Sequence, residues 1–497
     1  MSAMWVRGCC AFRVGVALVL ALGLNASAVY AQSASSLIAA ARAGDLVLVR
    51  SLIAAGADVD ARQGDGATAL HWAAHRNDLD AAALLVQAGA KVDVANALQA
   101  TPLWLAAVNG SAPMIELLLR VDADPNVSLV EGETPLMSAA RTGNVASVEL
   151  LLAAGADTDA AELERGQTAL MWAVAQGHAA VARVLIDRGA DLHARSRVWD
   201  QLENTAGNTN PSGNFRMAHG GSTPLLLAAR WGDVATARVL VEAGADVDDT
   251  AASGASALVI AAHSGHAEFG RYLLEQGADA NAADAGYTAL HAAVLRGQSG
   301  LVRALLDHGA DPNALITHGT PGRRFSADYS IRHQAVGANA FWLAAKYGEA
   351  DILRMLAVEG TDPSVTPANG VSALQACIGL PAISQENRRN RVGVPMTDLA
   401  VQEGLVVELA RVVLEMGVDV NAADQRGNTA LHDAVRSGLG EVVAFLTRRG
   451  ADVNAANDRD QTALTLAETP LPVTGTNGRR ATQPEIAAFL RGLGAED

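Results

Sequence analysis

The sequence predicts an all-α solenoid of about twelve stacked helical pairs, terminal caps included, and two coupled repeats predict it. The first repeat is the triplet Gly-Ala-Asp, which begins at Gly56, Gly155, Gly189, Gly244, Gly277, Gly309 and Gly450. The second is a Thr-(Ala/Pro)-Leu start, whose copies and variants begin at Thr68, Thr101, Thr134, Thr168, Thr223, Ser256, Thr288, Asn339, Ser372, Thr429 and Thr462. Intervals of 32 to 34 residues separate most neighbouring copies. A unit of this length gains a hydrophobic core only by stacking on its neighbours.

Each unit begins and ends with residues that suit helix termini. The Thr or Ser hydroxyl is a good N-cap, because it accepts a hydrogen bond from an otherwise unpaired N–H. Pro102 and Pro135 follow at the first helical position, where a missing N–H costs little. A glycine such as Gly143 ends this inner helix, because glycine adopts the left-handed conformation cheaply. The apolar spacing that begins at Val148 then predicts an outer helix, which ends at the next Gly-Ala-Asp.

The start motif resembles the ankyrin repeat, whose unit of about 33 residues carries a T-P-L-H-x-A core. Thr68-Ala-Leu-His71 and Thr288-Ala-Leu-His291 carry the resemblance, which covers nearly all of the chain after residue 35. It implies helix–turn–helix units joined by projecting β-turn fingers, and a concave groove lined by the fingers and the inner helices. It also implies a scaffold that binds other proteins and is not an enzyme.

Four segments are predicted along the chain. Residues 1–31 read as a cleavable signal peptide, in which Arg7 and Arg13 precede an apolar run. We therefore expect a periplasmic or secreted protein; a retained anchor is the alternative, although the run is too short to span a membrane comfortably. Residues 32–64 form an N-terminal capping repeat, residues 65–482 the array, and residues 483–497 a C-terminal capping helix.

Insertions interrupt the array near residues 196–219, 315–338 and 379–404, with a shorter one near 469–481. The first two follow a Gly-Ala-Asp triplet and precede the next helix start, so they lengthen fingers. The other two separate the two helices of one unit. Long loops in a compact array are functional or disordered.

Charge and cysteine content exclude several classes of function. The formal net charge is −16, which opposes nucleic-acid binding because that needs a basic face. After signal removal Cys377 is the only cysteine, so no intramolecular disulfide is possible. We expect Cys377 to be a small buried apolar residue, and no cofactor is predicted.

The candidate binding residues come from the two positions before each inner-helix glycine, which the family exposes to the groove. These positions are rich in cations for so acidic a chain, and Trp231 and Tyr347 add residue types common in binding hot spots. The predicted protein-binding residues at these positions are Arg230, Trp231, His263, Arg296, Lys346 and Tyr347, and the insertion near 315–338 adds Arg323 and Arg324. The alternative is that the cations only complement the negative ends of the helix dipoles.

Other aromatic and histidine positions receive structural interpretations. Trp72 and Trp172 occupy a position that Leu105, Leu227, Leu343 and Leu466 fill in other repeats, so we expect them in the core. Trp104 and Trp342 replace the signature histidine and are candidates for stiffening the seam between repeats. The four-residue spacing of His71 and His75 could suit zinc, but no third ligand stands out and no metal site is predicted.

The insertion near 315–338 is the most chemically rich stretch, with Arg323 and Arg324 able to bind a carboxylate or phosphate. The alternative is a finger that folds back on its own aromatic residues. No enzyme motif is present. A site built from the insertions, such as His333 with Asp328 or His219 with Asp200, is the alternative function: an enzyme or small-ligand binder.

The prediction is a non-catalytic scaffold that binds another protein, with an acidic partner segment as a candidate, through the concave groove of repeats six to nine and the two long fingers. An immunity or chaperone-like role towards one exported enzyme is an alternative form of this binding, and a single stoichiometric partner would distinguish it. We expect a monomer with no nucleic-acid partner and no membrane span after signal cleavage.

Overall fold

The computed structural model describes residues 34–204, 214–320, 331–379, 399–470 and 482–496, and their helices form twelve consecutive pairs. The predicted signal peptide lies outside these residues. The chain divides into two compact units. One comprises Met1–Arg197, Thr223–Ala228 and Ala235–Ala245, and the other comprises Val198–Ser222, Ala229–Val234 and Asp246–Asp497. The all-α solenoid class is confirmed.

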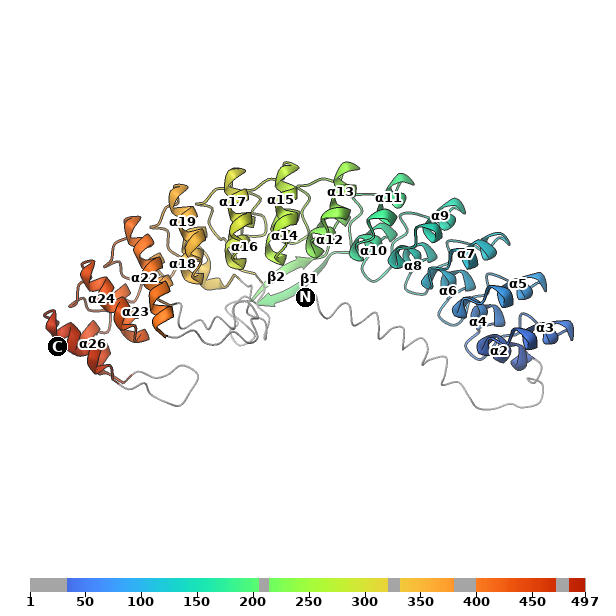
Figure 1. Ribbon diagram of the computed structural model, residues 1–497, viewed down its shortest axis with the longest axis horizontal. Helices are drawn as coiled ribbons and strands as arrows, with labels where there is room; N and C mark the ends of the chain where they lie inside the picture. The colour runs from blue at the N-terminus through green and yellow to red at the C-terminus, as the bar shows by residue number, and fades with distance from the viewer. Residues whose placement is uncertain (1–33, 205–213, 321–330, 380–398, 471–481, 497) are drawn as a thin grey trace. The chain divides into compact units, whose positions relative to one another are not determined.

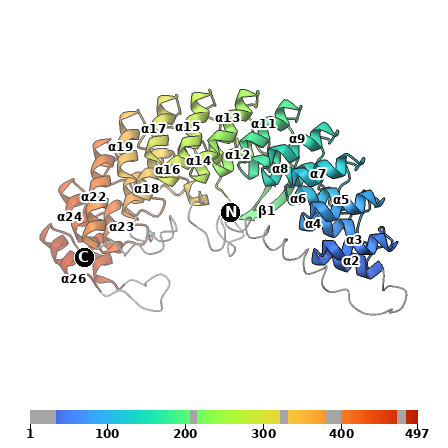
Figure 2. The same ribbon diagram turned by 45° about the vertical axis from the view of Figure 1, so that its right-hand side comes forward.

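The first unit contains the pairs of repeats one to five. Its inner helices pack one on the next in chain order, and its outer helices form a second row beside them (Figures 1 and 2). The inner helices are α2 (Ala34–Ala43), α4 (Ala69–Arg76), α6 (Pro102–Val108), α8 (Pro135–Thr142) and α10 (Ala169–Ala175). The outer helices are α3 (Leu46–Ala54), α5 (Leu79–Gln87), α7 (Ala112–Leu119), α9 (Val145–Ala153) and α11 (Ala179–Asp187).

The second unit contains repeats seven to twelve, and repeat six, formed by α12 (Pro224–Trp231) and α13 (Val234–Glu242), is shared between the units. Its inner helices are α14 (Ala257–Ser264), α16 (Ala289–Arg296), α18 (Ala340–Tyr347), α20 (Ala373–Ile378), α23 (Ala430–Ser437) and α25 (Ala463–Glu468). Its outer helices are α15 (Ala267–Glu275), α17 (Ser299–Asp307), α19 (Ala350–Val358), α22 (Leu399–Glu415), α24 (Gly440–Arg448) and α26 (Pro484–Gly492). Small Ala-Ala pairs and larger residues such as Phe269 and Phe341 fill the space between the rows and are fully buried.

The predicted helix-start chemistry is present at the inner helices. The Thr134 hydroxyl accepts a hydrogen bond from the backbone N–H of Met137 at 3.3 Å, and Pro135 occupies the first helical position. At the other end of α8, Gly143 is left-handed. These contacts lie within one repeat and satisfy groups that any helix end leaves unpaired.

The signature histidines join neighbouring repeats. His291 Nδ1 accepts from the backbone N–H of Thr288 at 3.1 Å, and its Nε2 lies 3.0 Å from the carbonyl of Ala314 in the next finger. His71 and His432 make the same pair of contacts. These distances assign the neutral ring with its proton on Nε2, because only that form accepts at Nδ1 and donates at Nε2.

Two other residue types make the same connection. Gln375 accepts from the backbone N–H of Ser372 at 3.1 Å and donates to the carbonyl of Asn428 at 2.8 Å. Trp342 donates its indole N–H to the carbonyl of Val371 at 2.8 Å, as expected for a residue that stiffens the seam. Trp104 is also buried, but its indole nitrogen has no hydrogen-bond partner among the described residues.

The fingers are joined by a second set of contacts. Asn281 Oδ1 accepts from the backbone N–H of Asp311 at 2.7 Å, and its Nδ2 donates to the carbonyl of Gly309 at 2.9 Å. Asp248, the equivalent residue of the preceding repeat, makes the first contact, to Asp279. The Gly-Ala-Asp-x-(Asp/Asn) pattern therefore connects successive fingers wherever Asp or Asn ends it; His193 and Ser364 occupy that position in two repeats.

The insertions add local structure to this frame. The first contains an antiparallel hairpin of β1 (Trp199–Asn204) and β2 (Asn214–His219), in which Trp199 pairs with His219. In the second, the backbone N–H of Ile316 donates to the carbonyl of Ala338 at 3.0 Å, which closes the base of the finger. The short helix η2 (His333–Ala335) lies between these two residues in the chain. In the third, α22 begins at Leu399, inside the range that the sequence assigned to the insertion.

Candidate binding face

The inner-helix face of the second unit is the surface formed by the last residues of its inner helices. Arg230 and Trp231 are the last two residues of α12, and Lys346 and Tyr347 are the last two of α18. Arg230 is exposed, and the other three are half-buried. Because both pairs occupy the same register, these helices present a cation and an aromatic ring at equivalent points.

Arg296 has a defined structural contact. Its Nε donates a hydrogen bond to the backbone carbonyl of His263 at 2.7 Å, in the last turn of the preceding inner helix. The His263 ring is half-buried and lies 6.1 Å from the ring of Tyr287. This contact gives Arg296 a structural role that requires no partner protein. A binding role for Arg296 and His263 stays a prediction.

The same kind of contact recurs between other repeats. The carbonyls that end one inner helix accept hydrogen bonds from side chains of the next repeat. The donors include Arg76 to Arg42 at 3.2 Å, Asn109 to His75 at 2.9 Å, His178 to Arg141 at 3.1 Å and His266 to Arg230 at 3.1 Å. The sequence interpretation placed each cation at the end of its own helix, whereas these side chains cap the helix one repeat earlier.

Replacing Arg296 by glutamine should therefore affect stability. The variant loses the hydrogen bond to the His263 carbonyl, and we expect the unfolding free energy to fall by about 1 kcal/mol. Chemical denaturation measures the change. If stability is unchanged while partner binding is lost, Arg296 is a binding residue and its capping role is minor.

Lys346 sits in a more charged setting than Arg230, whose pKa is lowered by burial alone. Burial lowers the pKa of Lys346, and the carboxylate of Asp433 opposes that effect. Arg332, an exposed residue of the second insertion, lowers the pKa of Lys346 further. A positive group that is costly to bury and close to a second cation favours an anionic contact.

Two predicted binding residues, Arg323 and Arg324, lie outside the described residues, as does Asp328. His333 is exposed in η2. In the first insertion, His219 stacks on Trp199 at 5.6 Å between ring centroids. Its Nε2 lies 3.1 Å from a carboxylate oxygen of Glu203, so Glu203 rather than Asp200 is the carboxylate placed beside this histidine.

The first unit also carries aromatic and charged residues on its inner helices. Trp72 is 7% exposed, as expected for the core, while Trp172 is half-buried. The guanidinium carbon of Arg42 lies 5.0 Å from the Trp72 ring centroid, and that of Arg141 lies 5.4 Å from the Trp172 centroid. The sequence did not reveal these pairs, because each joins residues of adjacent repeats.

Metal and thiol chemistry have little support in the described part of the chain. Both ring nitrogens of His71 are engaged in the contacts that join repeats, so it is not available to pair with His75 as a zinc ligand. Within the described ranges no group of three His, Cys, Asp or Glu side chains could hold a metal ion. Cys377 is fully buried, and burial raises the pKa of its thiol to about 12.

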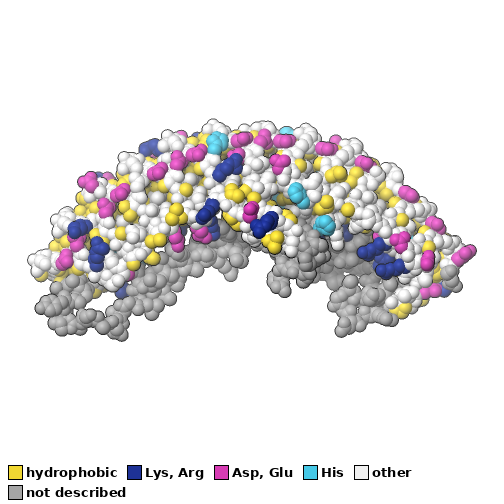
Figure 3. Space-filling model, turned by 180° about the vertical axis from the view of Figure 1, so that it is seen from behind, with side chains coloured by type: hydrophobic (Ala, Val, Ile, Leu, Met, Phe, Trp, Pro, Cys, Tyr) yellow, Lys and Arg dark blue, Asp and Glu magenta, His cyan; other side chains and the backbone are white. Residues whose placement is uncertain are grey.

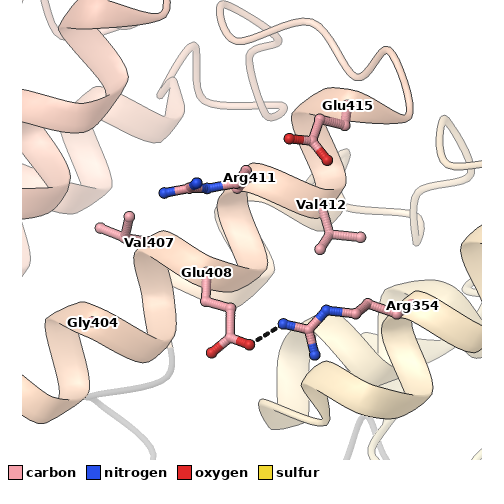
Figure 4. A pocket seen from close by; sticks show the side chains of 7 residues that line it. All are labelled: Arg354, Gly404, Val407, Glu408, Arg411, Val412 and Glu415. Atoms are coloured by element: carbon pink, nitrogen blue, oxygen red, sulfur yellow. Dashed lines mark hydrogen bonds and ion pairs between the residues drawn. The ribbon is translucent and has the colours of Figure 1, made fainter.

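A pocket of about 300 Å³ lies on the outer helices, between α19 and α22. Figure 4 shows Arg354 of α19 paired with Glu408 of α22 at its edge, with Arg411 and Glu415 further along α22. Arg354 and Glu408 form an ion pair within its lining, and the pocket does not include any residue of the inner-helix face.

Charged side chains on the surface are mixed in sign. On the side of the molecule shown in Figure 3, acidic and basic side chains are interspersed, and no continuous basic stripe crosses it. Among the helices that the structure describes, none combines the length and the apolar character that a membrane crossing requires.

Comparison with known proteins supplies the family. A model of ankyrin repeats (3 copies) matches residues 37–129, 122–196, 225–316 and 341–457, which together make up most of the chain. A search of curated proteins gives no match. The recurrent helix starts, the histidine contacts between repeats and this match lead to one conclusion: the chain belongs to the ankyrin repeat family.

Proposed function

We propose that this protein is a non-catalytic scaffold that binds one partner protein through the inner-helix face of repeats six to nine. Ankyrin repeats generally mediate protein–protein interactions. The observation that carries the proposal is the equal register of Arg230–Trp231 at the end of α12 and Lys346–Tyr347 at the end of α18. Trp, Tyr and Arg are the residue types that dominate binding hot spots.

The chemistry of this face favours an acidic segment in the partner. Arg230 is exposed and permanently charged, and Lys346 is half-buried beside a second cation, Arg332. An Asp or Glu side chain brought to these residues would form charge-assisted hydrogen bonds, which are stronger than neutral ones. Trp231 and Tyr347 would supply the apolar contact area around them.

The protein is proposed to act in an exported compartment as a monomer. Arg7 and Arg13 before an apolar run support export, because this is the pattern of a secretory signal peptide. A partner would then be found in the periplasm or outside the cell.

Affinity capture from the exported fraction tests the proposal. Wild type is compared with a variant in which Arg230, Trp231, Lys346 and Tyr347 are all alanine. The matched control changes Arg271 and Arg303, exposed on outer helices α15 and α17, to alanine. It removes the same number of positive charges from the same region.

We expect wild type and the control to retain one discrete protein that the folded four-site variant loses. Each hot-spot truncation costs about 2 kcal/mol, so four together should abolish capture. If the variant retains the same protein as wild type, the inner-helix face of repeats six to nine is not the binding surface.

A further inference from the structure

The hairpin of the first insertion is a sheet of only two strands, β1 and β2 (Figure 1). Its register pairs Trp199 with His219 at one end and Asn204 with Asn214 at the other. Within the described residues neither strand pairs with a further strand, and no helix packs extensively against the hairpin. A two-stranded hairpin alone is marginally stable in water, and it gains stability from a third strand or from packing on a helix. Its edges are therefore open to pairing with another chain.

β1 exposes large apolar side chains to solvent. Residues 199–202 are all exposed, with Trp199 at 48% and Leu202 at 62%. Val198, directly before the strand, is 55% exposed. Because successive side chains point to opposite faces of a strand, Trp199 lies on one face of the hairpin and Leu202 on the other. A chain that covers both residues at once must therefore lie along the edge of β1.

The edge of β2 offers less apolar surface. Its exposed side chains are Asn214 and Arg216, and its apolar residues Phe215 and Met217 are half-buried. Cross-strand side-chain pairs are the main source of sheet stability, and aromatic and aliphatic residues form the favourable ones. A third strand thus gains more beside β1 than beside β2.

Side-chain contacts on one face of the hairpin hold β1 against β2. The Trp199 ring stacks on the His219 ring, with 5.6 Å between their centroids. A carboxylate oxygen of Glu203 lies 3.1 Å from Nε2 of the same histidine. These contacts order β1 before any partner arrives, which reduces the conformational entropy that binding must overcome.

The charges of β1 limit which strand can pair with it. Asp200 and Glu203 are its charged residues, and it carries no cation. Opposite charges across a strand pair stabilise it, whereas like charges destabilise it. Pairing with β1 of a second copy would bring four carboxylates together, so the charges oppose self-association through this edge. They favour a strand that brings Lys or Arg to the carboxylates and apolar residues to Trp199 and Leu202.

We propose that the edge of β1 binds an extended segment of a partner protein, which adds to the hairpin as a third strand. In this mode main-chain hydrogen bonds supply affinity and side-chain pairs supply specificity. The segment carries Lys or Arg opposite Asp200 and Glu203. The inference goes beyond the proposed function, because it concerns main-chain pairing in the insertion and requires none of the inner-helix residues.

The test uses a labelled hexapeptide, Lys-Val-Thr-Lys-Val-Val, designed as the antiparallel complement of residues 198–203. Two further peptides carry N-methyl groups on alternate residues, one on the odd positions and one on the even positions. In an antiparallel strand alternate residues direct their N–H groups to opposite edges, so each peptide lacks the donors of one edge. Binding is followed by fluorescence anisotropy at low salt.

Two protein variants test the charge match. Asp200→Lys reverses a charge in the middle of the proposed strand pair. Asp307→Lys is the matched control, because Asp307 is exposed at the end of outer helix α17 and its substitution changes the net charge equally. The four-site alanine variant is included as well, and circular dichroism verifies that each variant is folded.

We expect the unmodified peptide to bind wild type. One N-methylated peptide should bind at least about tenfold more weakly, because it loses the hydrogen bonds to β1, and the other should stay within about twofold. Asp200→Lys should weaken binding about tenfold and Asp307→Lys less than about twofold. No binding to folded wild type, or equal effects of the two N-methylations, would overturn the strand pairing. The four-site alanine variant should bind the hexapeptide as wild type does, so a failure of this inference is distinguishable from a failure of the proposed function.

Discussion

A His291→Gln protein should lose about 3 kcal/mol less stability than wild type when the pH falls from 7 to 4. Burial lowers the pKa of His291 to about 4, whereas the unfolded chain has a histidine pKa of about 6.5. Below pH 6.5 the unfolded state binds a proton that the folded state does not. Each pH unit between these two values therefore removes about 1.4 kcal/mol from the folded state, and the loss is complete only below pH 4.

The structural cause is the pair of contacts that His291 makes. Its Nδ1 accepts from the Thr288 N–H at 3.1 Å, and a protonated ring has no acceptor to offer there. Glutamine is a matched replacement, because Gln375 makes the equivalent pair of contacts in repeat ten and does not titrate. We expect the two proteins to have similar stability at pH 7.

Hydrogen exchange of the α16 amides measures the effect locally, which suits a long repeat array that need not unfold in one step. Wild type and variant are compared at the same pH, so the intrinsic pH dependence of exchange cancels. An equal loss of protection in both proteins between pH 7 and pH 4 would show that His291 is not the titrating group.

Gly254→Val should cost at least about 3 kcal/mol, against about 1 to 2 kcal/mol for Gly277→Val. Both glycines are left-handed, with φ of +78° and +90°, so valine is strained at either position. A Cβ at Gly254 would lie 2.5 Å from the backbone carbonyl oxygen of Asp284 in the next finger, whereas a Cβ at Gly277 meets nothing within 4 Å. Backbone atoms cannot move aside as a flexible side chain can, so the fingers must separate.

Unfolding by denaturant measures both changes. Gly277→Val isolates the backbone strain, and the difference between the two variants reports the contact between fingers. Equal losses would mean that the fingers accommodate the extra atoms, and an unchanged curve for Gly277→Val would contradict the left-handed helix end at this residue.

Much of the fold could be predicted because its determinants lie within a repeat. Thr134, Pro135 and Gly143 define the start and end of α8 through contacts a few residues apart. Hydrogen bonds between repeats were harder to predict. Arg296 donates to a carbonyl 33 residues earlier, and nothing in its local sequence distinguishes a helix cap from a binding residue.

The candidate site was predictable only in part. The register of the repeat correctly placed Trp231 and Tyr347 at the ends of inner helices. The hydrogen bonds of Arg436 with Asp433 and Asn428 could not be predicted, because they depend on Gln375 replacing a signature histidine and on Asp433 occupying a position that most other repeats fill with apolar residues. The hairpin register that sets His219 beside Glu203 likewise depends on where the two strands pair.

The central claim is that the inner-helix face of repeats six to nine binds a protein. Its most direct test is the dissociation constant of the captured partner, measured by titration calorimetry for wild type, the four-site alanine variant and the Arg271/Arg303 control. The account predicts a loss of at least about 100-fold for the four-site variant and a change of less than about threefold for the control. Equal dissociation constants for wild type and the four-site variant would contradict it.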